Sequence, residues 1–211
     1  MDEWNLNSKP ALVIIHMQEG IAGSLLSQDR AREVRESDHI PHQQALLKAF
    51  RAKKLPVIYV NVNNPVSPAD KYPVYGTMCE FMRKQAEMRR MGDDNLKRVD
   101  VIPELAPLPG EPVLFNWFLG AFTHSGLEET LKACGINTIV FFGMALHVAV
   151  FNATVQAVDL SYSVIVPQDA CVPTLSANRT PEMMRIREAF LEMLSRYALV
   201  TTVDDVIAHL G

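Results

Sequence analysis

The 211-residue sequence predicts an α/β fold of three layers (αβα), in which helices flank both faces of an open parallel β-sheet of about six strands. Two observations support this prediction. Short apolar runs alternate with longer segments of helical period, which is typical of βαβ units around a parallel sheet. The most hydrophobic run, at 137–146, is continuous, as is typical of a strand buried on both faces. We therefore expect 137–146 at the centre of the sheet, within one domain that spans residues 1–211.

The first half of the chain contains two expected strands and one expected helix. The apolar run at 11–17 predicts the first strand, and the helical period at 38–54 predicts a helix that leads to a second strand at 56–62. Residues 63–110 hold many of the prolines and one further helical candidate at 78–91. A long irregular connection of this kind is either mobile surface or part of a site, and because this one follows the end of a strand, a lid or a pocket wall is one of the two interpretations.

The second half continues the same alternation and ends in two helices. Ser125 predicts the start of one helix as its N-cap, and Gly135 predicts its end. Pro181 favours the first position of a later amphipathic helix. The expected strands are 111–116, 137–146, 162–170 and a short strand near 199, and the expected helices are 125–135, 147–160, 181–198 and one at the end of the chain.

Composition excludes several classes of partner. The formal net charge is -4 and the pI is near 5.9, so no basic surface is expected for nucleic acid. No window approaches the roughly 18 apolar residues that a membrane span needs, and the N-terminus shows no signal-peptide pattern. Three cysteines without metal or redox spacing suit a reducing compartment. We therefore expect a cytoplasmic protein that binds neither nucleic acid nor a membrane.

Candidate site residues follow the ends of three expected strands. In an open parallel sheet, ligands bind outside the carboxyl ends of the strands, near the point where the strand order reverses. His16 follows the first strand and Asn116 ends the third. The turn after the fourth strand leads into a helix, so we expect free N–H groups around His147, Val148 and Ala149 that could hold an anion or oxyanion.

Three blocks of sequence resemble the isochorismatase-like hydrolase family, also called the cysteine hydrolase family. "ALVIIHMQEG" at 11–20 resembles the family opening, in which aliphatic residues precede Asp-Met-Gln. "VIPELAPLPGEPVLFNWFLGAF" at 101–122 is similar to the stretch in which a lysine ends the third strand and an Ala-Phe pair follows. Residues 127–170 resemble the longest signature, which contains Gly-x-x-Thr, a cysteine in the next turn, and a closing Asp-Ala. The resemblance covers about residues 10 to 200 and implies a Rossmann-like α/β fold, the isochorismatase-like hydrolase fold.

The sequence departs from the family at the positions that carry its chemistry. The family uses an Asp to activate the thiol of a Cys and a Lys to support the charged state. The resemblance matches the Asp to His16, the Lys to Asn116 and the Cys to Ala149. Leu146 replaces the threonine of the turn, where a cis peptide common in the family would join Ala145 to Leu146. Ala149 has no nucleophilic atom, so thiol chemistry at that position is excluded.

The resemblance still implies one route for catalysis. Isochorismatases proper hydrolyse a vinyl ether without a cysteine and use the Asp as proton donor. Histidine can also donate a proton, because its unperturbed pKa is about 6.5. Our first hypothesis is therefore a small-molecule hydrolase, or a related lyase or isomerase, with His16 as general acid or base and Asn116 orienting the substrate. The residues expected to contact substrate are Gln18, Trp117, Ala145, Leu146, His147, Val148 and Ala149.

Other interpretations stay open. His16 can simply be a polar strand-end residue bonded to a neighbouring loop, and the chain can be an inactive member of the family that binds a metabolite or a protein partner. Family members commonly form dimers or larger oligomers, so we expect a homo-oligomer whose assembly could itself be the function. The zinc branch of the family has Asp-x-His after the second strand, where this chain has Asn61 and Asn63. His39 and His42 have metal-like spacing, but we interpret them as solvated. We expect no metal and no cofactor.

Overall fold

The computed structural model describes residues 9–23, 34, 37–63, 83, 99–116, 119–172 and 181–210. In this part of the chain seven parallel strands form one sheet, in the order β3-β2-β1-β4-β5-β7, with β6 beside the end of β4. The strands are β1 (Pro10–Ile15), β2 (Val57–Val62), β3 (Val113–Asn116), β4 (Thr138–Met144), β5 (Ser163–Pro167), β6 (Cys171–Val172) and β7 (Leu199–Thr201).

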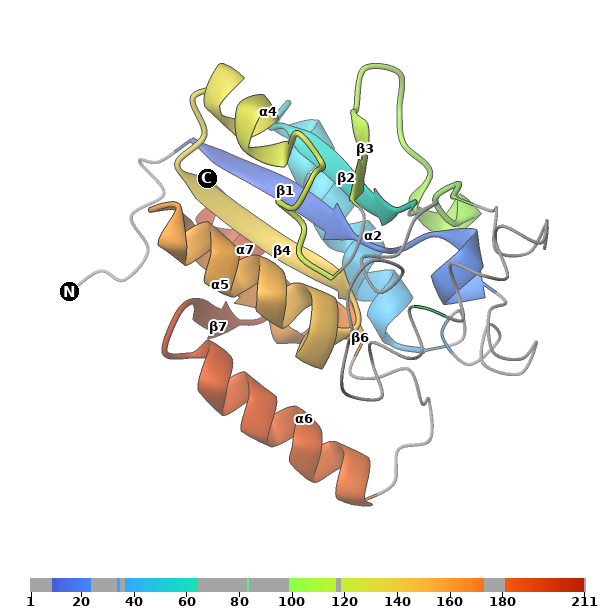
Figure 1. Ribbon diagram of the computed structural model, residues 1–211, viewed down its shortest axis with the longest axis vertical. Coiled ribbons are helices and arrows are strands. Elements are labelled where there is room, and N and C mark those ends of the chain that lie inside the picture. The colour runs from blue at the N-terminus through green and yellow to red at the C-terminus, as the bar shows by residue number, and fades with distance from the viewer. Residues whose placement is uncertain are drawn as a thin grey trace.

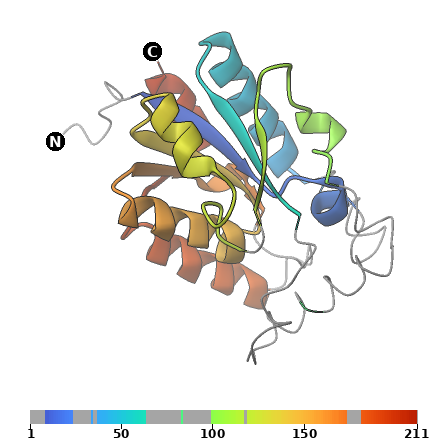
Figure 2. The same cartoon turned by 45° about the horizontal axis from the view of Figure 1, so that its top comes forward.

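Helices cover both faces of the sheet. Figure 1 shows α4, α5 and α6 on the near face and α2 and α7 behind it, and Figure 2 shows the same two layers from another side. The helices are α2 (His39–Ala52), α4 (Leu127–Ala133), α5 (Phe151–Asp159), α6 (Pro181–Leu194) and α7 (Val203–His209). Short helical turns connect them at η1 (Glu19–Gly23), η3 (Pro103–Leu105), η4 (Leu146–Val150) and η5 (Gln168–Ala170). None of the helices in the described residues is long and apolar enough to cross a membrane.

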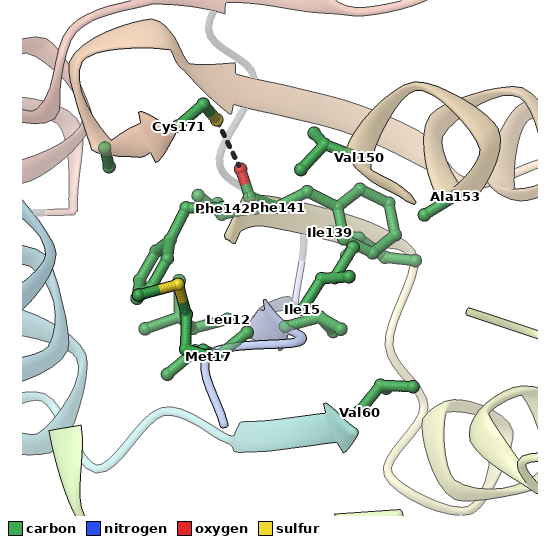
Figure 3. Packing of buried hydrophobic residues seen from close by; sticks show 14 of the residues in the cluster. Leu12, Ile15, Met17, Val60, Ile139, Phe141, Phe142, Val150, Ala153 and Cys171 are labelled. Atoms are coloured by element: carbon green, nitrogen blue, oxygen red, sulfur yellow. Dashed lines mark hydrogen bonds between the residues drawn. The ribbon is translucent and has the colours of Figure 1, made fainter. Parts of the chain in front are cut away.

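The core forms because β1 and β4 are apolar on both faces. Every residue of these two strands is buried. Figure 3 shows Phe141 pointing toward Val150 and Ala153 of the near layer, whereas Phe142 points to the other face beside Met17. Each such side chain stabilises the fold by about 1.5–3 kcal/mol when it is fully buried. Two helix layers therefore pack on the same pair of central strands.

The predicted fold is confirmed, and most elements lie where the sequence indicated. β4 lies between β1 and β5, as predicted for the most hydrophobic run. Gly135 has a φ of 66° after the end of α4, as predicted for the residue that ends this helix. The N-cap of α4 is Gly126, so the prediction of Ser125 as N-cap is wrong by one residue, although the Ser125 hydroxyl still accepts a hydrogen bond from the Leu127 N–H at 3.1 Å. The sequence did not predict β6 or η1. The helix expected at 78–91 lies outside the described residues apart from Arg83, and the single-domain prediction stays a prediction.

The strand order reverses between β1 and β4, so ligands are expected at the carboxyl ends of this pair. Gly143 lets the two strands approach closely at this point. Its φ is 148°, and a Cβ atom there would lie 2.0 Å from the carbonyl oxygen of Ile15. A residue with a side chain would therefore force the strands apart directly beside His16.

Candidate active site

His16 stands where β1 ends at the switch point. Its backbone N–H donates a hydrogen bond to the Val60 carbonyl at 2.8 Å, so it continues the pairing with β2 for one residue. Its φ of 53° then turns the chain out of the sheet, and non-glycine residues adopt this left-handed conformation only uncommonly. The side chain is buried. The backbone thus fixes the position of the imidazole at the carboxyl edge.

The structure brings His16 and Asn116 together although they are 100 residues apart in sequence. The His16 Nε2 atom lies 3.1 Å from the Asn116 Oδ1 atom, and both side chains are buried. The Asn116 Nδ2 atom donates to the carbonyl of Gly120 at 3.0 Å. Since a carbonyl can only accept, this second bond fixes which end of the amide faces His16.

This orientation of the amide determines where the His16 proton lies. The Asn116 oxygen is an acceptor, so the bond at 3.1 Å requires the proton to be on Nε2 of the imidazole. In a neutral ring with a proton on Nε2, Nδ1 carries the lone pair.

The Gln18 side chain is hydrogen-bonded to the backbone of β2. Its Nε2 atom donates to the Val62 carbonyl at 3.1 Å, and its Oε1 atom accepts from the Val62 N–H at 2.7 Å. The residue is 1% exposed. This amide completes the hydrogen bonding of the end of β2, and the substrate contact predicted for Gln18 would require these two bonds to be replaced.

The turn after β4 differs from the sequence prediction. The N–H groups of Val148 and Ala149 donate to the Ala145 carbonyl at 3.1 and 3.0 Å, and the Val150 N–H donates to the same oxygen at 3.3 Å. The prediction that the N–H groups of Val148 and Ala149 are free is therefore wrong. The reason is that η4 is a wide turn whose N–H groups converge on one carbonyl. The predicted location of the cis peptide is also wrong, because it joins Met144 to Ala145.

The remaining predicted contacts are distributed around this turn. Ala145, Leu146 and Ala149 are buried. The ring of His147 is half-buried and makes an edge contact with Phe190 of α6, with ring centroids 5.6 Å apart. These residues line the beginning of the helix that follows β4. Trp117 lies outside the described residues.

Neither thiol among the described residues is suited to act as a nucleophile at the carboxyl edge of the sheet. Cys171 pairs with Gly143 in the sheet, and its Sγ atom donates to the Pro167 carbonyl at 3.4 Å. Complete burial raises the pKa of the Cys171 thiol to about 12, so it stays protonated and poorly nucleophilic at neutral pH. Cys134 is exposed at the end of α4, at the opposite edge of the sheet from His16. Cys79 lies outside the described residues.

Of the two histidines near the start of α2, His39 is hydrogen-bonded to the loop after β5. The His39 Nδ1 atom lies 2.8 Å from the Asp169 carbonyl, and the His42 Nε2 atom lies 3.8 Å from the Asp169 carboxylate. The prediction of a solvated side chain is therefore wrong for His39, whereas the His42 side chain is 41% exposed and lies beyond hydrogen-bond distance of Asp169. Within the described residues no three His, Cys, Asp or Glu side chains are grouped as a metal site. At the end of β2, Asn61 donates to the Val99 carbonyl at 2.7 Å.

Comparison with known proteins agrees with the arrangement of these elements. The profile of the isochorismatase domain matches residues 10–205. The phenazine biosynthesis protein PhzD1 of Pseudomonas aeruginosa is 32% identical over 108 residues, which are 51% of this chain and 49% of PhzD1. The uncharacterized isochorismatase family protein YwoC of Bacillus subtilis is 28% identical over 167 residues, which are 77% of each chain.

One solved structure extends the comparison to the whole fold. A cysteine hydrolase from Pseudomonas syringae pv. phaseolicola superimposes with a TM-score of 0.75 at 22% identity, over 96% of this chain and 92% of that chain. At this identity the likeness shows the fold alone. In the comparison with PhzD1, by contrast, this chain matches only about half of the length of that protein.

Proposed function

Because the chain belongs to the isochorismatase domain family, we propose that it is a small-molecule hydrolase that works without a cysteine nucleophile. His16 is its general acid or base, and Asn116 orients His16 and the substrate. The observation that carries this proposal is the buried contact of 3.1 Å between the His16 Nε2 and Asn116 Oδ1 atoms, beside the switch point of the sheet. Hydrogen-bonded pairs of this kind orient the imidazole of catalytic histidines.

The tautomer assigns the proton transfer to one atom. Nε2 stays bonded to Asn116, so for an amide Nδ1 takes a proton from the attacking water and returns it to the leaving group. For an enol ether the protonated Nδ1 donates its proton to the alkene carbon, and water then adds to the resulting oxocarbenium ion and gives a proton back to Nδ1 as the ether C–O bond breaks. Ala149 takes no part in covalent chemistry, and the protonated Cys171 thiol does not either. Water is then the nucleophile, and the reaction is direct hydrolysis.

The substrate is a small carbonyl, amide or enol-ether compound. We take this class from the family resemblance, in which isochorismatases hydrolyse a vinyl ether and cysteine hydrolases attack a carbonyl carbon. A lyase or isomerase reaction on the same class of compound would use the same proton transfer at His16.

A second candidate function is binding without chemistry. The specific observation in its favour is that the Val148 and Ala149 N–H groups are bonded to the Ala145 carbonyl, so they do not stabilise an oxyanion in this arrangement. A protein that has lost this donor pair and the nucleophile could retain a binding site for a metabolite. This candidate predicts ligands that bind and are not converted.

Turnover assays on a substituted histidine test the first candidate. Small carbonyl, amide and enol-ether compounds would be screened by thermal shift, and those that bind would be assayed for hydrolysis. His16→Gln removes the titrating nitrogen and keeps a donor for Asn116, so we expect turnover to fall by about 10²-fold or more. His209→Gln, on the exposed end of α7, serves as the matched control and should leave turnover unchanged. Unchanged turnover in His16→Gln would refute the assigned role.

A thiol test separates this mechanism from that of the cysteine hydrolases. Cys171→Ala removes the buried thiol that pairs with Gly143 near the end of β4. We expect the activity to survive both this substitution and alkylation of the exposed Cys134 thiol. Loss of turnover with retained folding in Cys171→Ala would show that a thiol is required. Binding of several compounds without any turnover would favour the second candidate.

A further inference from the structure

Gln156 of α5 holds the short loop that follows β3. Its Oε1 atom accepts a hydrogen bond from the Phe122 N–H at 3.3 Å, and its Nε2 atom donates to the Thr123 hydroxyl at 3.0 Å. The Thr123 N–H donates to the Gly120 carbonyl at 3.2 Å, which closes the loop on itself. One half-buried side chain thus fastens two successive residues of this loop to the helix behind it.

The loop lies directly against the amide of Gln156. A Cβ atom at Gly120 would lie 2.5 Å from both polar atoms of this amide, so only glycine allows the contact without displacing Gln156. The Gly120 carbonyl is therefore held in place by the close packing of its own residue and by the bonds at Phe122 and Thr123. No sequence motif pointed to Gln156 or Gly120.

The position of this carbonyl determines the orientation of Asn116. The Gly120 oxygen accepts from the Asn116 Nδ2 atom at 3.0 Å, and this bond keeps the Asn116 oxygen directed at His16. If the loop moved, the amide could rotate by half a turn and present Nδ2 to the imidazole. His16 Nε2 would then have to accept, and the ring proton would move to Nδ1.

We propose that Gln156 is a positioning residue that acts through Gly120 and Asn116 to keep the His16 proton on Nε2. The inference rests on the proposed function, because it states which nitrogen of the general acid or base exchanges a proton. Gln156 itself touches neither His16 nor the reacting atoms. Substitution of Gln156 should therefore change the tautomer of His16 while the protein stays folded.

The ring ¹⁵N signals of His16 report the tautomer without any need for a substrate. In the unaltered protein we expect the pattern of an Nε2-protonated ring. Gln156→Leu removes both bonds to the loop, and we expect the two ring signals of His16 to move toward each other as the Nδ1-protonated form gains population. Gln156→Glu keeps an acceptor for Phe122 and can accept from the Thr123 hydroxyl, so it should retain the original pattern.

Two further variants keep the test decisive. Gln44→Leu is the matched control, because Gln44 also holds a loop carbonyl, that of Glu104, at 3.0 Å, but on α2 away from the site. It should leave the His16 signals unchanged. Thr123→Val removes only one of the bonds of Gln156, and should shift the signals in the same direction by less. This milder variant replaces Gln156→Leu if the latter does not fold.

The outcomes separate this inference from the proposed function. The positioning role is overturned if the unaltered protein lacks the Nε2-protonated pattern, or if folded Gln156→Leu and Thr123→Val both retain it. If the tautomer changes as expected but His16→Gln has no effect on turnover, the positioning role stands and the proposed function fails. If turnover depends on His16 while the tautomer is insensitive to Gln156, the proposed function stands alone.

Discussion

Replacement of Gly143 by alanine tests the close approach of the two central strands. The added Cβ would lie 2.0 Å from the Ile15 carbonyl oxygen, and contacts between a Cβ and other atoms below 3.0 Å are essentially never seen. The strands would have to separate by about 1 Å, against a normal spacing of about 4.8 Å. Hydrogen bonds near 2.9 Å do not survive such a change.

The expected cost combines two effects. Separation at the register pair of Ile15 and Gly143 breaks about two backbone hydrogen bonds, at about 1 kcal/mol each. Alanine at a φ of 148° adds about 1–2 kcal/mol of backbone strain. We therefore expect Gly143→Ala to lower the free energy of unfolding by about 3–4 kcal/mol, which few single substitutions reach.

Urea unfolding at 25 °C measures this difference, and Gly110 provides the control. Gly110 also has a positive φ, of 95°, but a Cβ there would meet nothing within 4 Å. Gly110→Ala should therefore cost only the backbone strain, about 1–2 kcal/mol. If the two substitutions destabilise the protein equally, the steric contact between β1 and β4 is not what requires glycine at 143. Failure of Gly143→Ala alone to fold would agree with the larger cost.

Two other substitutions test contacts that anchor the outer elements. The Glu111 carboxylate is bonded by Arg51, with N–O distances of 2.8 and 2.7 Å. Burial acts to raise the pKa of Glu111, but hydrogen bonds from Arg51 and the Leu108 N–H outweigh it and lower the pKa. The stabilisation is therefore present above the unfolded-state pKa and lost as the pH falls through the folded-state pKa. Glu111→Gln should lower the free energy of unfolding by about 1 kcal/mol at pH 7 and by progressively less below about pH 4.5. Thermal unfolding of both proteins over a range of pH measures this difference. A difference that does not change with pH would contradict this reasoning. Thr202→Ala removes the hydroxyl that accepts from the Asp205 N–H at 3.2 Å, and should cost about 1 kcal/mol, whereas no change in urea unfolding would show that this cap contributes nothing.

The sequence predicted the elements whose signal is local and periodic. The helical period at 38–54 gave α2 nearly to its ends, and Pro181 marked the first residue of α6. The continuous apolar run gave β4 and its central place in the sheet. These features depend on neighbouring residues and on burial of whole faces, so a single sequence contains enough information to find them.

The features that the sequence did not predict depend on contacts between distant residues. The carboxyl-edge position of His16 followed from topology, but its bond to Asn116 joins residues 100 apart and depends on the Gly120 carbonyl. The N–H groups of Val148 and Ala149 were expected to be free because a regular helix start leaves them unpaired. In the structure three N–H groups share the Ala145 carbonyl. This arrangement depends on the local path of the backbone, which no residue type in the turn predicts.

The hydrogen bond between His16 and Asn116 also has a direction, from donor to acceptor, and this direction can be tested. By the resemblance, relatives carry an acceptor after β1, the Asp, and a donor at the end of β3, the Lys. Here His16 donates from the β1 side and Asn116 accepts on the β3 side. Each single reversion should therefore be unfavourable: His16→Asp sets a carboxylate against the Asn116 oxygen, and Asn116→Lys sets an ammonium against the protonated Nε2.

A double-mutant cycle measures this coupling. We expect His16→Asp alone to destabilise the protein by about 3 kcal/mol, because it leaves a buried charge without a partner. The combination with Asn116→Lys restores an acceptor facing a donor, so the double variant should be more stable than the sum of the single effects predicts, by about 1–3 kcal/mol. Single effects that add within about 0.5 kcal/mol would show that the two positions do not act as a pair. The replacement of the family Asp by His16 and of the family Lys by Asn116 would then be two independent changes. Strong coupling would instead mean that the acceptor and the donor were exchanged together.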